Sequence, residues 1–532
     1  MYRIRNFKVD INDDSDILKL ISKRVNIAIS DIIFYKVVKK AIDFSDRENL
    51  SFLYTINFEL KNEKRYYHLE KKQIINKIKI KKREKINLVN QDLSFKPIVV
   101  GMGPAGLFAA YTLAKYGIPP LIFEMGKKVE DRIIDVKKYW KSGILNENSN
   151  VQFGEGGAGT FSDGKLTTRL NEPRLDEILD LMVKLGAPNT ILDGGKAHVG
   201  TDKLYIMLIN FRNLLIKMGC EIFFQSEVKE FIQNDKILRG VIVNGEKIEC
   251  QNLILATGNG SYNTYNTLLK NGVKITPKSF GIGIRIEHRR KFIDNIKFGK
   301  LMNHPKLGAA DYSLFYNIPR TNRSVYSFCM CPGGIVVASA SENGRIITNG
   351  MSYFKRDGIN SNSALLVNVT PLDYMIDDNP LSGFLFQKKW EEIAFKLGGK
   401  DGKAPAQSVV NFLKDRDGGD ISIASYKPGV VENNLRKALP EFVTNGLITA
   451  LPKFDEIMNG FIKNGILTGV ETRSSSPIKI NRGEDFQSVS MKGLYPCGEG
   501  SGYAGGIICS AIDGIKAAEA MVKKYNKKRE EI

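Results

Sequence analysis

Cysteine is scarce in this chain, and its scarcity excludes whole classes of protein. The six cysteines among 532 residues form neither the dense framework of a disulfide-rich secreted domain nor paired C-x-x-C zinc knuckles. The N-terminal stretch "MYRIRNFKVD" also lacks the apolar core of a signal peptide. A reducing, cytoplasmic location is expected from both observations. The cysteines are Cys220, Cys250, Cys329, Cys331, Cys497 and Cys509.

Internal repeats and low-complexity tracts are also lacking, and a long uncharged run stands out at Pro97 to Ala114. That run is about long enough to cross a bilayer. Several glycines interrupt it, however, and Pro119 and Pro120 follow it, so a single spanning helix is a poor interpretation. We therefore interpret the run as separate pieces of a soluble fold, and no membrane association is expected.

Those pieces form a β-α-β unit. "PIVVG" predicts a short buried strand, "PAGLFAAYTLAKYG" a helix that ends at a glycine, and "PLIFE" a second buried strand. Gly101, Gly103 and Gly106 then make the pattern G-x-G-x-x-G where the first strand turns into the helix. The first glycine allows the tight turn, the second lets a pyrophosphate approach the backbone, and the third lets helix and strand pack closely. The unpaired N–H groups of the helix start would hold the phosphates.

The acid at the end of the second strand supports a dinucleotide site. Glu124 stands where a carboxylate is expected to bind ribose hydroxyls, and it would repel a 2′-phosphate. A glycine pattern alone is weak evidence for a dinucleotide site, but inside a β-α-β unit with this acid the pattern is specific for one.

Three further segments favour FAD over NAD as the dinucleotide. "LILATGNG" predicts a buried strand that ends in Ala-Thr-Gly, and Gly493 to Met521 predicts a strand, a glycine loop and a helix. The loop "NVQFGEGGAGTFSDGKLTTR" is too rich in glycine for regular structure, and its backbone N–H groups from Gly156 to Thr160 would lie along the pyrophosphate. The alternatives are an ordinary strand–helix unit and a flexible surface loop, although Phe153 and Phe161 need burial.

These segments, in this order and spacing, resemble the bacterial FAD-dependent dehydrogenases, which share their FAD domain with the glutathione-reductase superfamily. "FGEGGAGTFSDGKLTTR", "FGIGIRIEH", "FCMCPGGIVV" and "VETRSSSPIKI" are similar to that family. The resemblance spans roughly Pro97 to the C-terminus and implies FAD and a redox role without a settled substrate. It also implies that Glu499 bonds the ribityl hydroxyls and that the helix beginning near Gly506 points at the flavin.

The residues expected to hold the cofactor come from these segments and their immediate neighbours. They are Gly101, Gly103, Pro104, Ala105, Gly106, Glu124, Met125, Arg132, Gly156, Gly157, Ala158, Thr160, Val228, Ala256, Thr257, Gly258, Gly498, Glu499, Gly505, Gly506 and Ile507.

The expected fold class is α/β, with a discontinuous Rossmann-like FAD-binding domain, an inserted α+β substrate domain and a small N-terminal α+β domain, for which a ferredoxin-like fold is one option. We assign residues 1–88 to the N-terminal domain, 95–285 and 480–532 to the FAD-binding domain, and 286–479 to the substrate or cap domain. The basic stretch Lys71 to Lys85 is expected to be a solvated connector, with RNA contact as the alternative.

Four residues are candidates for chemistry beside the flavin: Lys165, Arg169, Arg285 and Tyr503. Cations there, and Arg473 as well, could stabilise an anionic reduced ring or clamp a carboxylate substrate. The alternative is that these residues are ordinary solvated charges on the surface. His288 is more often a packed residue than a proton donor in such a pattern. No metal site is expected.

The positions of the cysteines exclude one class of flavin-dependent redox enzyme. Disulfide reductases of the superfamily carry their reactive pair just after the first β-α-β unit, and no cysteine precedes Cys220 here, so that class is excluded. Cys329 and Cys331 would share one side of a strand. Substrate thiols and metal ligands remain open for them, but a structural role at the strand end is favoured.

The sequence thus predicts an FAD-dependent oxidoreductase, a dehydrogenase acting on a small and anionic organic substrate, without a dedicated nicotinamide domain. The net charge of +20 leaves a nucleic-acid-directed flavoprotein, such as a tRNA-modifying enzyme, as the alternative. We do not expect nucleic acid as a partner, because the surplus of basic residues is mostly dispersed. A flavin-bearing interaction protein without turnover is a third possibility. The oligomeric state is left open.

Overall fold

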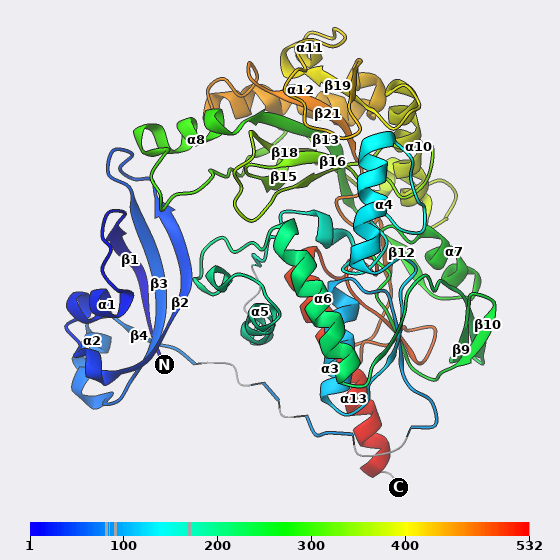
Figure 1. The fold of residues 1–532 in the computed structure, drawn as a ribbon, viewed down its shortest axis with the longest axis horizontal. Coiled ribbons are helices and arrows are strands. Elements are labelled where there is room, and N and C mark those ends of the chain that lie inside the picture. Colours follow the sequence, from blue (N-terminus) through cyan, green and yellow to red (C-terminus); the bar gives the residue numbers. More distant parts are fainter. Residues whose placement is uncertain (80–82, 85, 90–92, 169–171, 531–532) are drawn as a thin grey trace.

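The described residues form three larger sheets, of four, five and seven strands, and three smaller ones (Figure 1). The computed structural model describes residues 1–79, 83–84, 86–89, 93–168 and 172–530. Arg169, one of the expected catalytic residues, therefore lies outside the described residues. Across the described residues, no helix is both long enough and apolar enough to cross a membrane.

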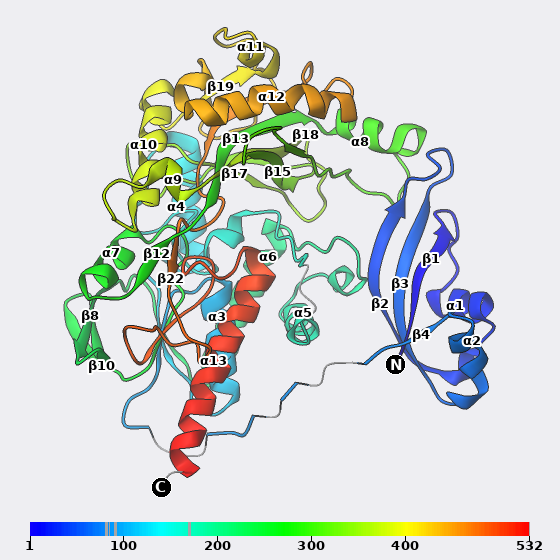
Figure 2. The same ribbon diagram turned by 180° about the vertical axis from the view of Figure 1, so that it is seen from behind.

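The N-terminal domain is a four-stranded sheet with two helices, and it stands beside the rest of the chain (Figures 1 and 2). Its strand order is β2-β3-β1-β4, and its elements follow one another as β-α-β-β-α-β, the arrangement of ferredoxin-like domains. Alternation in β3 buries every second side chain, from Phe52 to Phe58, against the helices. The elements are β1 (Tyr2–Asp10), α1 (Ile17–Val25), β2 (Ile32–Asp43), β3 (Ser51–Leu60), α2 (Tyr67–Lys71) and β4 (Asn76–Lys77).

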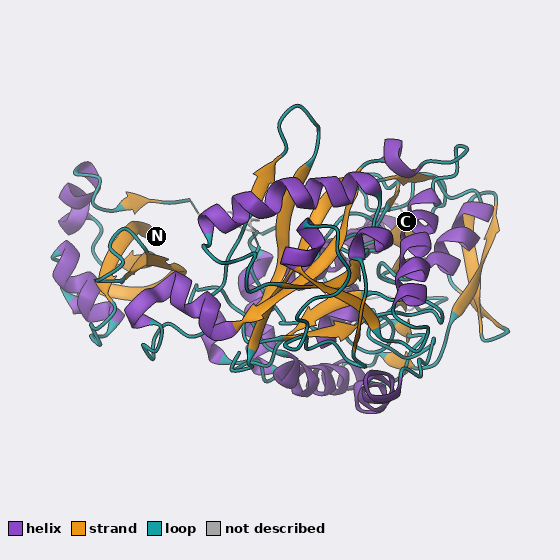
Figure 3. Ribbon diagram, turned by 90° about the horizontal axis from the view of Figure 1, so that it is seen from above, coloured by secondary structure: helices purple, strands orange, loops and turns teal. Residues whose placement is uncertain are grey.

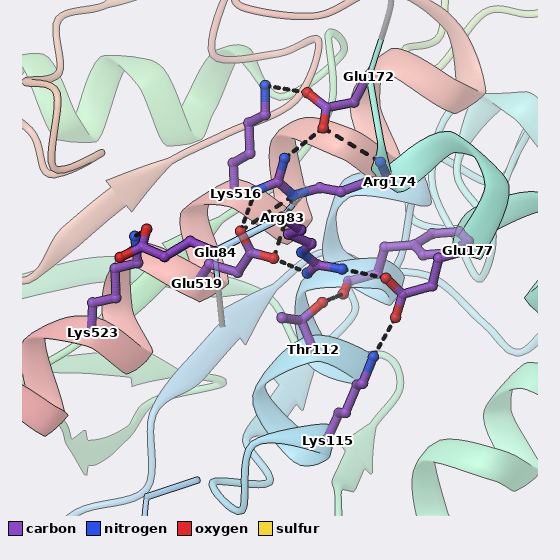
Figure 4. A network of polar contacts seen from close by, with 11 residues as sticks. Arg83, Glu84, Thr112, Lys115, Glu172, Arg174, Glu177, Lys516, Glu519 and Lys523 are labelled. Atoms are coloured by element: carbon purple, nitrogen blue, oxygen red, sulfur yellow. Dashed lines mark hydrogen bonds and ion pairs between the residues drawn. The ribbon is translucent and has the colours of Figure 1, made fainter. Parts of the chain in front are cut away.

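The basic connector differs from the expected solvated segment. Asn76 and Lys77 form β4, which pairs with β1 and completes the sheet. Farther along, the guanidinium of Arg83 contacts the carboxylates of Glu177 and Glu519 (Figure 4). These ion pairs join the connector at Arg83 to two helices of the next domain. At Arg83 the connector is therefore held in place and is not a solvated linker.

The second domain has a five-stranded, fully parallel sheet of order β23-β11-β5-β6-β7. Its first β-α-β unit has the expected elements. Along β5 the side chains alternate, so Val99 packs under the helices while Ile98 and Val100 pack on the opposite face. The elements are β5 (Ile98–Val100), α3 (Pro104–Lys115), β6 (Leu121–Phe123), α5 (Arg174–Lys184), α6 (Thr201–Lys217), β7 (Glu221–Phe223), β11 (Leu253–Leu255), β23 (Leu494–Pro496) and α13 (Gly506–Glu530).

Helices α3 and α13 lie in close contact on one face of this sheet, although most of the chain separates them (Figure 2). A Cβ on Gly514 would lie 2.1 Å from the carbonyl oxygen of Ala105, so only glycine permits this approach. The other face carries α7 (Tyr262–Lys270) and a three-stranded antiparallel sheet of β8 (Val228–Asn234), β9 (Ile237–Val243) and β10 (Glu246–Glu249).

The third part, which we call the cap domain, is a seven-stranded sheet of order β14-β15-β18-β13-β21-β19-β20. Viewed from above, long helices lie across its outer face (Figure 3). The strands are β13 (Phe280–Arg289), β14 (Phe315–Asn317), β15 (Ser324–Cys331), β18 (Asn360–Val369), β19 (Ala404–Ser408), β20 (Val430–Glu432) and β21 (Ile466–Glu471). The helices are α8 (Arg290–Phe298), α9 (Pro371–Tyr374), α10 (Ser382–Leu397), α11 (Val409–Leu413) and α12 (Glu441–Ile457).

The cap domain begins earlier than expected. The boundary expected between residues 285 and 286 cuts through β13, yet all of β13 pairs with β18 inside the cap sheet. The change of sheet occurs instead between Pro277, the last residue of β12 (Ile275–Pro277), and Phe280. The sequence "FGIGIRIEH" in β13 contains no signal that assigns the strand to the cap sheet or to the parallel sheet.

Three smaller elements link the parallel-sheet domain to the cap. Strand β12 pairs with β22 (Ile478–Ile480), so the chain leaves and re-enters the parallel-sheet domain side by side. Helix α4 (Val129–Ser142) reaches the hairpin of β16 (Ile335–Ala338) and β17 (Thr348–Met351), where the indole of Trp140 donates to the carbonyl of Ala338 at 3.0 Å.

Candidate functional site

The first glycine turn leaves an opening at its middle glycine. A Cβ on Gly101 would lie 2.5 Å from the carbonyl oxygen of Ala256, and one on Gly106 would lie 1.9 Å from that of Gly101. These two glycines are therefore required by packing. A Cβ on Gly103, in contrast, would meet a single atom within 4 Å, the Cα of Gly157 at 3.9 Å. The space in front of Gly103 and the start of α3 is where the pattern predicts the pyrophosphate.

The second glycine loop is held in shape by Arg132, whose side chain is fully buried. Its guanidinium donates to five backbone carbonyl groups and to the hydroxyl of Thr160, so every N–H is used within the loop. Burial lowers the pKa of Arg132 to about 10. The carbonyl groups belong to Asn150, Val151, Gly154, Glu155 and Gly157.

The expected contact between Arg132 and the cofactor is therefore wrong. All five guanidinium N–H groups are saturated by the loop, so Arg132 acts on the site only through the loop's shape. Thr160 likewise spends its hydroxyl on the carbonyl of Glu155, at 3.3 Å. Gly156, Gly157 and Ala158 carry backbone groups that lie along the first glycine turn, since the N–H of Gly156 donates to the carbonyl of Met102 at 2.8 Å.

Glu124 joins the two glycine loops. Its buried carboxylate accepts backbone N–H groups from Met102 at 2.8 Å, from Gly126 at 2.9 Å and from Gly154 at 2.9 Å. A carboxylate has about four acceptor positions, so about one is left for a ribose hydroxyl. Glu124 thus builds the site whether or not it binds ribose, and the ribose contact stays a prediction.

The turn before α13 carries the next expected contacts. The carboxyl group of Glu499 accepts a hydrogen bond from the backbone of Gly506, and burial raises its pKa to about 7. A Cβ on Gly258, Gly505 or Gly506 would meet nothing within 4 Å. The strand end at Gly258 and the start of α13 therefore leave room for a ligand, as Gly103 does. The observed openings fit an extended dinucleotide lying along the carboxyl ends of the parallel strands.

Other expected cofactor residues lie in packing positions. The side chain of Val228, at the start of β8, is buried in the core, and a Cβ on Gly498 would lie 2.8 Å from the Cβ of Ala105. The contact expected between Val228 and the cofactor stays a prediction. For the remaining expected residues, contact with the cofactor stays a prediction. They are Pro104, Ala105, Met125, Ala256, Thr257 and Ile507.

Arg285 is not available to clamp a substrate. It is completely buried and binds Glu471 with two hydrogen bonds of 2.5 and 2.8 Å. Its other N–H groups donate to the carbonyl of Cys329 and to the side chains of Asn349 and Asn362. Burial alone would lower the pKa of Arg285, but the Glu471 carboxylate raises it above the ordinary value. The guanidinium therefore stays charged, paired and saturated, and the expected direct contact with substrate is wrong.

Arg473 and Tyr503 are engaged in the same way. Arg473 pairs with the buried Glu391, with two contacts of 3.0 Å. The hydroxyl of Tyr503 donates to the carbonyl of Ile480 at 3.0 Å, and the guanidinium of Arg482 lies 3.6 Å above its ring. Tyr503 as a catalytic group is therefore also wrong, because its proton is held by the backbone.

His288 lies in the core of the cap domain. It stacks between Phe292 and Phe461, and burial lowers its pKa to about 4. An imidazole that stays neutral among aromatic rings is a packing residue, in agreement with the structural interpretation.

Lys165 keeps a partly free charge. Its side chain is 30% exposed and lies 3.9 Å from Asp163. Asp163 itself is bound more closely by Arg356, at 2.5 Å. An isolated backbone bridge between Lys165 and His198 fixes the loop segment that carries the lysine. Lys165 is therefore the expected cation whose ammonium group remains available.

Two groups that interact with Glu499, Cys329 and Lys278, were undervalued from the sequence. Lys165 and Arg285 act electrostatically on Cys329, and Cys329 in turn acts on Glu499. Lys278 also lies near Glu499, and burial lowers its pKa. The spacing of Cys329 and Cys331 was the one sequence signal for this cluster, whereas nothing around Lys278 marks it. Among the described residues, no group of three or more histidine, cysteine or acidic side chains is arranged to hold a metal ion.

Comparison with known proteins gives the family. Residues 279–474 match the model of the family described as "FAD-dependent protein, C-terminal domain-like", which coincides with most of the cap domain. Across 528 residues the chain is 44% identical to an uncharacterized protein of Clostridium beijerinckii, covering 98% of this chain and 99% of that protein. The chain belongs to this family of FAD-dependent proteins. FAD is accordingly the cofactor of this flavoprotein, and the open glycine turns are the residues that fit it.

Two other similarities either cover less of this chain or have a lower sequence identity. A ribosomal RNA dihydrouridine synthase of Haemophilus influenzae is 29% identical over 166 residues, which is 30% of this chain and 39% of that protein. The crystal structure of CtdE in complex with FAD is 14% identical, covers 84% of this chain and 90% of its own, and superposes with a TM-score of 0.31.

Proposed function

We propose that this protein is an FAD-dependent oxidoreductase, a dehydrogenase that moves a hydride between the flavin and a small, anionic organic substrate. The observation that carries the proposal is the line of openings at Gly103, Gly258, Gly505 and Gly506, beside the cap sheet. The bound flavin supplies two-electron chemistry. The glycine turns bind its phosphates, Arg132 and Glu124 fix the loops, and the cap domain supplies side chains to the substrate.

The cation that supports an anionic substrate is Lys165. Arg285, Arg473 and Arg356 are neutralised by Glu471, Glu391 and Asp163, whereas the ammonium of Lys165 is partly exposed and loosely paired. A carboxylate beside Lys165 would balance its charge without unpairing any buried group.

The substrate test compares two variants of Lys165 with the wild type. A panel of neutral and carboxylate-bearing organic donors is screened for anaerobic bleaching of the flavin absorbance. For a carboxylate donor, Lys165→Met is expected to raise KM about tenfold or more, which corresponds to about 1.4 kcal/mol. Lys165→Arg is expected to restore most of that loss, and KM for neutral compounds stays unchanged. Equal effects on neutral and anionic donors would contradict the assignment.

The cofactor test is independent of substrate. The purified protein is expected to be yellow and to release FAD on denaturation, while FMN in the supernatant would contradict the dinucleotide site. NADPH is expected to reduce the flavin slowly, because the sequence predicts no nicotinamide domain. Fast, saturable reduction by NADPH would overturn that expectation.

A second candidate function is an RNA-directed flavoenzyme. The match to a ribosomal RNA dihydrouridine synthase and the net charge of +20 favour it. Arg3 and Arg5 lie on one face of β1 and repel each other, as expected of a surface that accepts phosphate. Retention of RNA that weakens with salt and is lost in Arg3→Glu/Arg5→Glu would favour this candidate, whereas retention unaffected by the double variant would exclude that face.

A further inference from the structure

Two cysteines meet at the end of one strand in the cap domain. Cys329 and Cys331 close β15, where the pairing with β18 passes from Phe328–Ala364 to Cys331–Asn362. Three steps along β15 thus oppose two along β18, which is a β-bulge with one extra residue. Cys329 takes up the bulge with a φ of 44° in the left-handed region, uncommon for a residue with a side chain. Bulges of this kind re-aim side chains and are enriched beside active sites.

The bulge brings the two sulfur atoms together. The thiol of Cys331 is a hydrogen-bond partner of the Cys329 sulfur, and it also lies 3.3 Å from the carbonyl oxygen of Cys329. Two residues of chain span at most about 7 Å. Disulfides bridge Cα atoms that lie about 4.4–6.8 Å apart, so the chain spacing of these two cysteines is compatible with a bond. Both cysteines are free thiols in the structure.

The charges around the pair differ from those around the other cysteines. The hydrogen bond from Cys331, aided by Lys165 and Arg285, holds the pKa of Cys329 well below its ordinary value. The hydrogen bond with Cys329, together with burial, raises the pKa of Cys331. At Cys220 and Cys250, in contrast, burial raises the pKa to about 12. One thiolate beside one thiol is the arrangement of a reactive dithiol, whereas buried neutral thiols are inert.

The position of Cys329 relates the pair to the cofactor. Its sulfur acts electrostatically on Glu499, in the turn before α13, and is acted on by Lys165, which follows the second glycine loop. Cys329 therefore lies between the two segments that border the flavin end of the dinucleotide site. Cys329 is also only partly buried, whereas Cys331 is buried.

We propose that Cys329 and Cys331 form a redox-active pair that exchanges two electrons with the flavin. In the oxidising direction the Cys329 thiolate and the Cys331 thiol join in an S–S bond, Cys331 gives up its proton, and two electrons would pass to FAD, which takes its second proton from solvent. In the opposite direction the reduced flavin returns two electrons and two protons, and the S–S bond breaks. Oxidant and reductant are thus the cofactor itself. The inference rests on the proposed function, since it requires a redox-active flavin in this cleft.

The test counts electrons in the holoenzyme. Air-oxidised wild-type protein is titrated anaerobically with dithionite, and we expect it to accept four electrons per FAD, two for the flavin and two for the disulfide. Cys329→Ser and Cys331→Ser are expected to accept two. Cys250→Ala, which removes a buried thiol far from the cleft, is expected to accept four and serves as the matched control.

A measurement without turnover tests the bond directly. Trypsin releases Ser324 to Arg345 as one peptide with both cysteines and no others. From air-oxidised wild-type protein this peptide is expected to be lighter by two hydrogens and to resist alkylation. After reduction of the holoenzyme it is expected to take up two alkyl groups.

The two proposals fail in different ways. A peptide that always carries two free thiols, with uptake of two electrons by the wild type, overturns the pair and leaves the flavoenzyme intact. A flavin that no donor reduces overturns the proposed function itself. The peptide measurement on wild-type protein decides the question even where a serine variant does not fold.

Discussion

Gly103 and Gly157 face each other across the two glycine loops. A Cβ on Gly157 would lie 3.1 Å from the Cα of Gly103, and a Cβ on Gly103 would lie 3.9 Å from the Cα of Gly157. The closeness of the two backbones means that a side chain at either position intrudes on the channel between the loops.

Gly103→Val is therefore expected to weaken FAD binding with little effect on folding. Gly103 has a φ of −74° and an extended ψ, which valine also adopts, so the substitution fills space without backbone strain. We expect the Kd for FAD to rise on the order of a hundredfold, measured by flavin fluorescence on titration of the apoprotein. Gly195→Val is the control, because a Cβ there meets nothing within 4 Å. Wild-type affinity in Gly103→Val would show that the phosphates lie elsewhere.

Arg285 and Glu471 are expected to behave as a buried ion pair, with no role in substrate affinity. Arg285→Met leaves the Glu471 carboxylate buried and unpaired, so the free energy of unfolding is expected to fall by about 3–5 kcal/mol. Replacing both residues with methionine is expected to recover much of that loss, because no lone charge remains. Denaturant unfolding of the two single variants and the double variant measures this. Additive losses in the double variant would contradict the coupling.

Glu155 is expected to make stability depend on pH. Its carboxylate is fully buried, one oxygen has no hydrogen-bond partner, and burial raises its pKa to about 7. Between the ordinary value of 4.5 and about 7 the native state therefore binds more protons than the unfolded state. Stability contributed by Glu155 is thus greatest at low pH and is lost as the pH rises through that window.

Glu155→Gln removes this titration. The difference in free energy of unfolding, wild type minus variant, is expected to fall from pH 4.5 to about 7 and to stay flat above it. Denaturant unfolding at a series of pH values provides the curve. A difference that stays flat across the window would mean that the ion pair with Arg212, at 2.8 Å, holds the carboxylate ionised throughout.

Arg83 is expected to couple the connector to the parallel-sheet domain. Glu519 is nearly buried and Arg83 largely so, whereas the neighbouring pair Lys523–Glu84 is exposed (Figure 4). A double-mutant cycle to alanine is expected to give about 1–3 kcal/mol for Arg83–Glu519 and below about 0.5 kcal/mol for Lys523–Glu84. Equal coupling in the two cycles would mean that the contact around Arg83 is no stronger than a surface ion pair.

Local patterns in the sequence predicted much of the fold. The β-α-β unit around Gly101 to Gly106 has the expected strands and helix, and the N-terminal domain has the expected α+β composition. These elements are marked by alternation, by glycine punctuation and by buried runs, all of which act over a few neighbouring residues. β4 was missed because two residues carry no periodicity.

The charge state of the site could not be predicted in the same way. Whether Arg285 and Arg473 are free depends on Glu471 and Glu391, which lie far away in the sequence and reach them through strand register and helix packing. The closeness of Cys329 to Lys165 likewise depends on how the cap domain lies on the parallel-sheet domain. Residue types around a motif show what chemistry is available, but only the tertiary pairing shows which charges are already neutralised.

The close contact of α3 with α13 sets the order in which this protein can mature. The ribosome makes α3 early, then the whole cap domain, and only then the turn at Gly498 and the helix that packs at Gly514 against Ala105. Until α13 emerges, the side of α3 that carries Ala105 lacks its partner helix, and the cradle for the dinucleotide lacks one wall. Contacts so distant in sequence form slowly. Nascent chains of this protein are therefore expected to need shielding from aggregation before cofactor loading, and loading is expected to be a late, post-translational event.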